Sequence, residues 1–134
     1  MDKAKVLLAE DDVVVAADLA IEMEAAGLVV AATICSLAGV LKLIEETPPD
    51  IVILNVALRD GASFPAARRL RALNIPFVFL TSFKKSEIDP EFQDVPLLEK
   101  PQRPGDVAAF VAGLAETRMQ TPDRGDGRSE PAPR

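Results

Sequence analysis

Four apolar runs of the sequence end in polar residues whose carboxylates and amide could bind a metal ion. The ends of the four runs are Glu10-Asp11-Asp12, Asn55, Thr81-Ser82 and Glu99-Lys100-Pro101. Carboxylate and amide oxygens are ligands for hard divalent cations. If the four ends meet in space, they bring acids, an amide, a hydroxyl and an ammonium group to one site that could hold such a cation.

Each of these residues also has an ordinary structural interpretation. Acidic residues after a strand stabilise the start of a following helix, because the helix dipole favours negative charge there. Thr81 fits a hydroxyl at a strand end, and Lys100 fits a surface lysine. Three adjacent carboxylates repel one another, however, and a divalent cation with oxygen ligands would relieve that repulsion. The functional hypothesis therefore depends on the four strand ends taken together.

The elements that would position these residues are short apolar runs that alternate with longer amphipathic segments. The predicted strands cover residues 5–9, 28–35, 50–55, 75–82 and 95–100, and the predicted helices cover 12–26, 36–46, 63–73, 84–93 and 104–118. Continuous apolar runs are typical of strands buried on both faces of a parallel sheet. We therefore predict an α/β fold, a doubly wound five-stranded parallel sheet with five helices. Ligands bind at the carboxyl ends of the strands in such sheets.

Local signals mark several of the predicted boundaries. Gly27 follows the first helix as a C-terminal cap, and Ser36 and Ser63 stand at the predicted starts of the second and third helices as N-caps. The segment 59–61, Arg-Asp-Gly, predicts a turn after the third strand.

Composition narrows the possible functions. The 134 residues fit one domain, and the segment 119–134 has almost no apolar residues, so we expect a disordered tail there. The net charge of −6 argues against nucleic acid or an anionic membrane as a partner. The sequence contains no histidine, which excludes Ser-His-Asp catalysis and imidazole metal sites. It shows neither a signal peptide nor an apolar run long enough to span a bilayer, so we expect a cytoplasmic location.

Four motifs carry a resemblance to a known family. KVLLAEDD, DIVILNVALRDG, PFVFLTS and LLEKP follow one another at the spacing found in response-regulator receiver domains. The chain resembles these domains from residue 4 to about residue 117, so we assign residues 1–118 to the domain. The resemblance implies the flavodoxin-like strand order 2-1-3-4-5.

The resemblance also implies a role for each residue at the strand ends. Glu10 and Asp11 match the acidic pair that holds Mg²⁺, and Ala57 matches the position whose backbone carbonyl binds the metal. Asn55 matches the phosphoacceptor aspartate, which also contributes to the metal site. The residues expected to contact the phosphoryl group are the Thr81 hydroxyl and the Lys100 ammonium. These roles agree with phosphoryl transfer, which is mostly positioning and charge neutralisation.

Asn55 and Leu97 depart from the family pattern. The family's aspartate attacks phosphorus and becomes an acyl phosphate, whereas an amide is a poor nucleophile that offers a metal one neutral oxygen. We therefore expect phosphorylation to be blocked and Mg²⁺ binding to be weakened. The amide is either natural, in a pseudo-receiver that signals by binding alone, or an engineered replacement of aspartate. Leu97 stands where the family usually has a Tyr or Phe whose ring swings inward when the threonine moves. A leucine has no ring that could move in this way with Thr81.

We accordingly predict a bacterial single-domain response regulator of a two-component phosphorelay that is not itself an enzyme. The sequence ends soon after the last predicted helix, so we expect output through protein–protein contact. The resemblance implies a histidine kinase or histidine phosphotransfer protein as one partner. A downstream protein would bind the face formed by the fourth helix, fifth strand and fifth helix, and a homodimer is a further possibility.

Other classes of protein fit the sequence less well. A haloacid-dehalogenase-like aspartyl phosphatase needs an aspartate at a strand end with a second acid two residues later. Here those positions are Glu10 and Asp12, and glutamate is the wrong nucleophile for that pattern. A phosphate-independent scaffold protein is the other alternative. A flavodoxin-like cofactor binder would need a phosphate-binding loop after the first strand, where this chain has acids.

Overall fold

The computed structural model describes residues 3–120, and in it five parallel strands form one sheet in the order β2-β1-β3-β6-β7. The strands are β1 (Lys5–Ala9), β2 (Val29–Ile34), β3 (Ile51–Leu54), β6 (Phe77–Thr81) and β7 (Leu97–Glu99). Counted in chain order within the sheet, this is the order 2-1-3-4-5. The predicted doubly wound parallel sheet is therefore confirmed.

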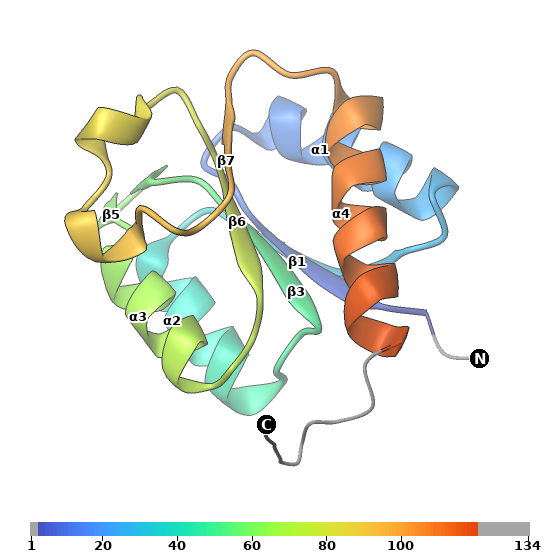
Figure 1. Ribbon diagram of the computed structural model, residues 1–134, viewed down its shortest axis with the longest axis horizontal. Coiled ribbons are helices and arrows are strands. Elements are labelled where there is room, and N and C mark those ends of the chain that lie inside the picture. The colour runs from blue at the N-terminus through green and yellow to red at the C-terminus, as the bar shows by residue number, and fades with distance from the viewer. Residues whose placement is uncertain (1–2, 121–134) are drawn as a thin grey trace.

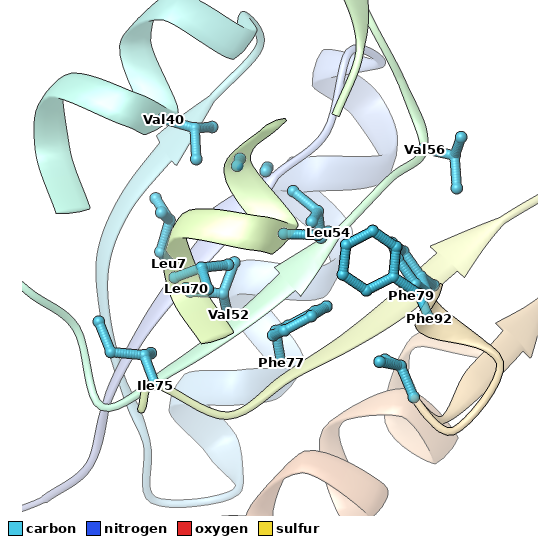
Figure 2. Packing of buried hydrophobic residues seen from close by; sticks show 14 of the residues in the cluster. Leu7, Val40, Val52, Leu54, Val56, Leu70, Ile75, Phe77, Phe79 and Phe92 are labelled. Carbon is cyan, nitrogen blue, oxygen red and sulfur yellow. The ribbon is translucent and has the colours of Figure 1, made fainter. Parts of the chain in front are cut away.

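Helices cover both faces of the sheet (Figure 1). The helices are α1 (Val13–Ala25), α2 (Leu37–Glu46), α3 (Phe64–Ala72) and α4 (Pro104–Gln120). The pair α2 and α3 lies on one face, and the pair α1 and α4 lies on the other. This arrangement divides the interior into two apolar clusters, one on each side of the sheet. Figure 2 shows the first cluster, where Leu7 and Val52 from the sheet lie beside Leu70 of α3.

Burial of the strands follows their place in the sheet. Every residue of β3 and β6 is buried, as expected for central parallel strands. The edge strand β2 instead alternates between exposed and half-buried residues, so the expectation of burial on both faces is wrong for this strand. An edge strand has a neighbour on one side only, so part of β2 stays open to solvent.

The predicted helix at residues 84–93 is absent, and this corrects the expected count of five helices. The segment forms two 3-10 turns, η1 (Lys85–Glu87) and η2 (Pro90–Phe92). Pro90 disfavours a helical conformation in the residue before it, and Asp89 has a ψ of 132°, which is far from the helical value. Ile88 and Phe92 are nevertheless buried in the first cluster, so the segment packs without forming a helix.

A short antiparallel hairpin follows β3 and was not predicted. Its strands are β4 (Ala57–Leu58) and β5 (Gly61–Ala62). The predicted turn at residues 59–61 is confirmed and connects these two strands. Gly61 has a φ of 138°, which explains why glycine is needed there.

The helix caps agree with the sequence at two of three positions. Gly27 has a positive φ of 89° after α1, and the Ser36 hydroxyl accepts a hydrogen bond of 3.0 Å from the Gly39 N–H. Ser63 does precede α3, but its side chain makes no capping hydrogen bond. Its hydroxyl is buried without any hydrogen-bond partner in the described part of the chain.

The predicted tail at 119–134 falls almost wholly outside the described residues, since α4 continues to Gln120. Within residues 3–120, no helix has the length and apolar character that crossing a membrane requires.

Candidate functional site

The ends of β1, β3, β6 and β7 bring the predicted site residues to one edge of the sheet. Parallel pairing aligns Ala9 with Leu54 and Thr81 with Glu99. The backbone continues this alignment past the strand ends, because the Asn55 N–H donates to the Ala9 carbonyl at 2.9 Å. The Lys100 N–H likewise donates to the Thr81 carbonyl at 2.8 Å. Sheet pairing therefore fixes the positions from which these side chains project.

The Asn55 amide lies between the two carboxylates that follow β1. Its nitrogen Nδ2 donates to Glu10 Oε2 at 3.2 Å and to Asp11 Oδ1 at 3.0 Å. Its oxygen Oδ1 accepts from the backbone N–H of Ala57 at 3.4 Å. Asn55 is only 6% exposed, so these contacts replace most of its contact with water.

Glu10 is the most heavily hydrogen-bonded acid of the site. The Lys100 ammonium pairs with Glu10 Oε1 at 2.9 Å, and the side chain of Glu10 is 3% exposed. Glu10 Oε2 accepts from the backbone N–H of Asp12 at 3.0 Å as well as from Asn55. A buried carboxylate requires such partners, because an unpaired charge is expensive away from water. Both oxygens of Glu10 are therefore already in use.

Asp12 caps the helix that follows it, which is the ordinary structural interpretation of the acidic run. Its Oδ1 accepts from the backbone N–H groups of Val14 at 2.9 Å and Val15 at 3.2 Å, which caps the start of α1. Of the three consecutive acids, Glu10 and Asp11 face the amide, and Asp12 belongs to the helix.

The side chains of Thr81 and Leu97 do not take part in the hydrogen bonds of Asn55. Thr81 is fully buried, and its hydroxyl accepts from the Phe83 N–H at 3.3 Å. Leu97 is half-buried and packs against the first apolar cluster. The structure thus joins Glu10, Asp11, Asn55 and Lys100 through side chains, while Thr81 contacts the next loop.

The donor set as placed does not fit the Mg²⁺ ion that the resemblance implied. An amide nitrogen is a hydrogen-bond donor and not a metal ligand, and this nitrogen is the atom that Asn55 turns toward Glu10 and Asp11. Among residues 3–120, no three Asp, Glu, His or Cys side chains are grouped so that they could hold a metal ion.

One residue beside the site, Asp60, was recognised from the sequence only as part of a turn. Its carboxylate accepts from the backbone N–H groups of Leu37 at 2.5 Å and Ala38 at 3.1 Å, at the start of α2. These backbone hydrogen bonds lower the pKa of Asp60. The contact joins the hairpin after Asn55 to a helix more than twenty residues earlier. No local sequence signal indicates such a distant partner.

Ion pairs hold the segment 84–94 against the rest of the domain. Arg68 of α3 pairs with Glu91 at 2.9 Å and Asp89 at 3.4 Å, and Arg71 pairs with Asp94 at 3.1 Å. Lys84 pairs with Glu99 at the end of β7 at 2.6 Å, and this carboxylate raises the pKa of Lys84.

Comparison with known proteins identifies the family through solved structures. A scan against models of protein families and a search of curated proteins both find no match. SdrG from Sphingomonas melonis Fr1 is 34% identical, with a TM-score of 0.71 over 85% of this chain and 99% of SdrG. The BeF3-activated conformation of SdrG from Pseudomonas melonis Fr1 is also 34% identical, with a TM-score of 0.68 over 85% of this chain and 99% of SdrG.

Two PhyR structures share the fold at lower identity. The REC domain of the response regulator PhyR from Erythrobacter litoralis is 18% identical, with a TM-score of 0.74 over 92% of this chain and 97% of that one. A mutant of the anti-anti-sigma factor PhyR from Bartonella quintana is 20% identical, with a TM-score of 0.76 over 90% of this chain. This chain spans only 51% of that protein.

The fold, the strand-end residues and these similarities define a regulatory module of two-component signalling. The chain belongs to the receiver domains of response regulators.

Proposed function

We propose that this protein is a receiver-type response regulator that is not phosphorylated at the usual position and acts by binding other proteins. The observation that carries the proposal is Asn55, a buried amide at the end of β3 whose nitrogen is bonded to Glu10 and Asp11. Formation of an acyl phosphate requires a carboxylate oxygen that attacks phosphorus. An amide lacks that nucleophile, and here its oxygen is turned toward the Ala57 N–H.

The remaining residues support a receiver site that lacks its acceptor alone. Lys100 lies at this edge, where it pairs with Glu10, and Thr81 lies at the end of the neighbouring strand. A lysine and a hydroxyl are the groups that stabilise a phosphoryl group in the family pattern. Asn55→Asp should therefore restore phosphorylation.

The test is incubation with a small-molecule acyl phosphate and Mg²⁺, followed by intact mass measurement. We expect the chain as given to gain no phosphoryl group and Asn55→Asp to gain one that is lost in base. Asn55→Asp combined with Lys100→Ala is the matched control and should gain much less. A phosphoryl group on Asn55 of the given chain would overturn the proposal. If Asn55→Asp also stays unmodified, the site has lost more than its acceptor, and restoration by one substitution is refuted.

The proposed partners are proteins of the same signalling system. A histidine kinase or histidine phosphotransfer protein could bind this chain without transferring a phosphoryl group, and would thereby be sequestered. We place the contact with a downstream protein, or with a second copy of the chain, on the surface formed by residues 84–94, β7 and α4. This surface includes the two 3-10 turns, η1 and η2, that take the place of the expected fourth helix. Phe110 of α4 is 38% exposed and offers an apolar contact.

The geometry gives no support to the phosphatase alternative. Glu10, which would be the nucleophile, is buried and paired with Lys100. Asp12, which would be the second acid, caps α1 through two backbone hydrogen bonds. Neither carboxylate is free to act as a nucleophile or a general acid on a substrate.

A further inference from the structure

The two acids of the site share a single amide nitrogen. Nδ2 of Asn55 carries two hydrogens, and the structure places one acceptor for each, Glu10 Oε2 at 3.2 Å and Asp11 Oδ1 at 3.0 Å. Two carboxylates that approach one atom would repel each other unless positive charge or hydrogen-bond donors lie between them. The amide provides the donors, and no hydrogen of Nδ2 is left for another partner.

Among the described residues, Lys100 supplies the one positive charge that is paired with the acids of the site. Its ammonium lies 2.9 Å from Glu10 Oε1, the carboxylate oxygen that the amide does not contact. The backbone N–H of Asp12 adds a further donor to Glu10 Oε2. Glu10 is thus paired on both oxygens, and Asp11, which is exposed, keeps contact with water.

A long hydrogen bond on the other side of the amide favours the same orientation. The Ala57 N–H donates to Asn55 Oδ1 at 3.4 Å, and a backbone N–H is always a donor. If the amide turned over to offer its oxygen to a cation, its NH₂ group would face the Ala57 N–H, donor against donor. The same turn would remove both hydrogen bonds to the acids. The closed network and a coordinated cation therefore exclude each other.

We infer that the Asn55 amide takes the place of the divalent cation in this receiver, and holds Glu10 and Asp11 together without Mg²⁺. Mg²⁺ binding is then weakened for two reasons. The site lacks the charge of an aspartate at position 55, and the cation must first displace the amide from Glu10 and Asp11. The inference rests on the proposed function in that both depend on the amide at position 55. It concerns the resting site alone, so neither a phosphodonor nor a partner protein is needed to test it.

The test is thermal unfolding of the full chain, followed by circular dichroism in 1 mM EDTA and in 10 mM MgCl₂ under matched ionic strength. We expect the melting temperature of the given chain to be the same in both buffers. Asn55→Asp should melt below the given chain in EDTA and gain about 5 °C in Mg²⁺, the shift for a domain of this size with a ligand at about ten times its Kd. Ala109→Asp, which adds a charge on the exposed side of α4, should show no response to Mg²⁺.

A second measurement reports on the amide itself. In a ¹⁵N-correlated NMR spectrum, the Asn55 side-chain NH₂ signals should stay unchanged during a Mg²⁺ titration. Substoichiometric Mn²⁺ should broaden the backbone signals of residues 10, 11 and 57 in Asn55→Asp and leave them sharp in the given chain. Broadening in the given chain, or an equal rise of its melting temperature in Mg²⁺, would overturn the inference. Either result leaves the phosphorylation test independent, because that test measures the nucleophile and not the cation.

Discussion

Lys100 is the residue on which the buried charge of Glu10 depends. The side chain of Glu10 is 3% exposed and that of Lys100 is 24% exposed, so the carboxylate has little access to water. Removal of one partner from a buried ion pair leaves the other charge uncompensated, which costs about 3 kcal/mol. We predict that Lys100→Met lowers the free energy of unfolding by roughly that amount in urea titrations.

The double variant Lys100→Met/Glu10→Gln separates this effect from simple loss of packing. Without the negative charge, the cost of an unpaired carboxylate is gone, and much of the lost stability should return. A Lys100→Met protein as stable as the parent would show that the pair with Glu10 contributes nothing.

Ser63 and Ser36 each precede a helix but differ in backbone conformation and in their hydrogen bonds. The Ser36 hydroxyl accepts from the Gly39 N–H, whereas the Ser63 hydroxyl is buried with no partner in the described part of the chain. We predict that Ser36→Ala lowers stability by about 1 kcal/mol, the usual value of an N-cap. Ser63→Ala should instead leave stability unchanged or raise it by up to about 1 kcal/mol, because a desolvated hydroxyl is removed. Paired urea titrations measure both, and equal losses would contradict the assignment.

At the residue scale, the sequence predicted which residues meet but not how they bond. Strand-end positions are set by backbone pairing, so Glu10, Asp11, Asn55 and Lys100 could be placed at one edge from the order of apolar runs. The direction of the Asn55 amide depends on the Ala57 N–H, which belongs to an unpredicted hairpin. The unpaired Ser63 hydroxyl depends on the packing around α3. Neither detail has a local sequence signal.

At the scale of elements, Asp60 connects the hairpin β4–β5 to the start of α2. Its carboxylate accepts from the Leu37 and Ala38 N–H groups, and these hydrogen bonds lower its pKa in the folded state. A lowered folded pKa means that the contact stabilises the fold above the unfolded pKa, near 4. The stabilisation is lost as the pH falls through the folded pKa.

We predict that Asp60→Ala lowers the free energy of unfolding by an amount that depends on pH. The parent should be the more stable protein at pH 7, and the difference between the two should shrink as the pH falls below about 4. Urea titrations from about pH 7 to about pH 2.5, a range that spans the carboxyl pKa, measure this difference. Asp123→Ala, outside the described residues, controls for loss of one negative charge. A difference that stays constant with pH would refute the cap.

The segment 84–94 shows where local propensity and tertiary contacts disagree. The amphipathic pattern suggested a helix, but Pro90 interrupts it, and α3 supplies arginines to the acids on either side. Arg71 pairs with Asp94 and lies 5.2 Å from the centre of the Phe92 ring. These contacts hold the segment in place of helical hydrogen bonds.

We predict that Arg71→Ala loosens this segment more than it weakens the whole domain. Exposed ion pairs contribute about 0–1 kcal/mol each, and the contact with the Phe92 ring adds about 0.5–1 kcal/mol. Hydrogen exchange of residues 84–94 should therefore speed up while the sheet amides stay protected. Arg69→Ala is the matched control, because the ion pair of Arg69 is with Glu45 of α2 and not with an acid of the segment. Equal exchange in both variants would rule out this role for Arg71.

Over the whole molecule, alternation of apolar runs and amphipathic segments was enough to predict the sheet and its two helical layers. Runs such as 51–54 are buried on both faces because helices from each side cover them. The edge position of β2 was not evident from its composition, since its residues are nearly as apolar as those of β3. Strand order was inferred from the receiver resemblance, and topology depends on connections that no single strand encodes.

The site and the surface of 84–94, β7 and α4 are joined through β6. Thr81 ends this strand, its hydroxyl contacts the Phe83 N–H, and Phe79 two residues earlier lies beside the Phe92 ring. We propose that an anion bound near Lys100 would draw Thr81 toward it and that the loop from Phe83 onward would follow, because the Thr81 hydroxyl contacts the Phe83 N–H. In the given chain Asn55 already bonds Glu10, and Glu10 pairs with Lys100, so we expect no anion to bind there and the domain to stay in one conformation.

We predict that beryllium fluoride with Mg²⁺ leaves the ¹⁵N-correlated NMR spectrum of the given chain unchanged. In Asn55→Asp it should shift the backbone signals of Thr81, Phe83 and residues 84–94, because the new carboxylate can hold a phosphoryl mimic beside Lys100. Adding Thr81→Ala to Asn55→Asp should keep the shifts near position 55 and remove those in 84–94, if the hydroxyl transmits the change. Shifts in 84–94 that survive loss of the hydroxyl would place the connection elsewhere, and shifts in the given chain would show that the amide does not lock the domain.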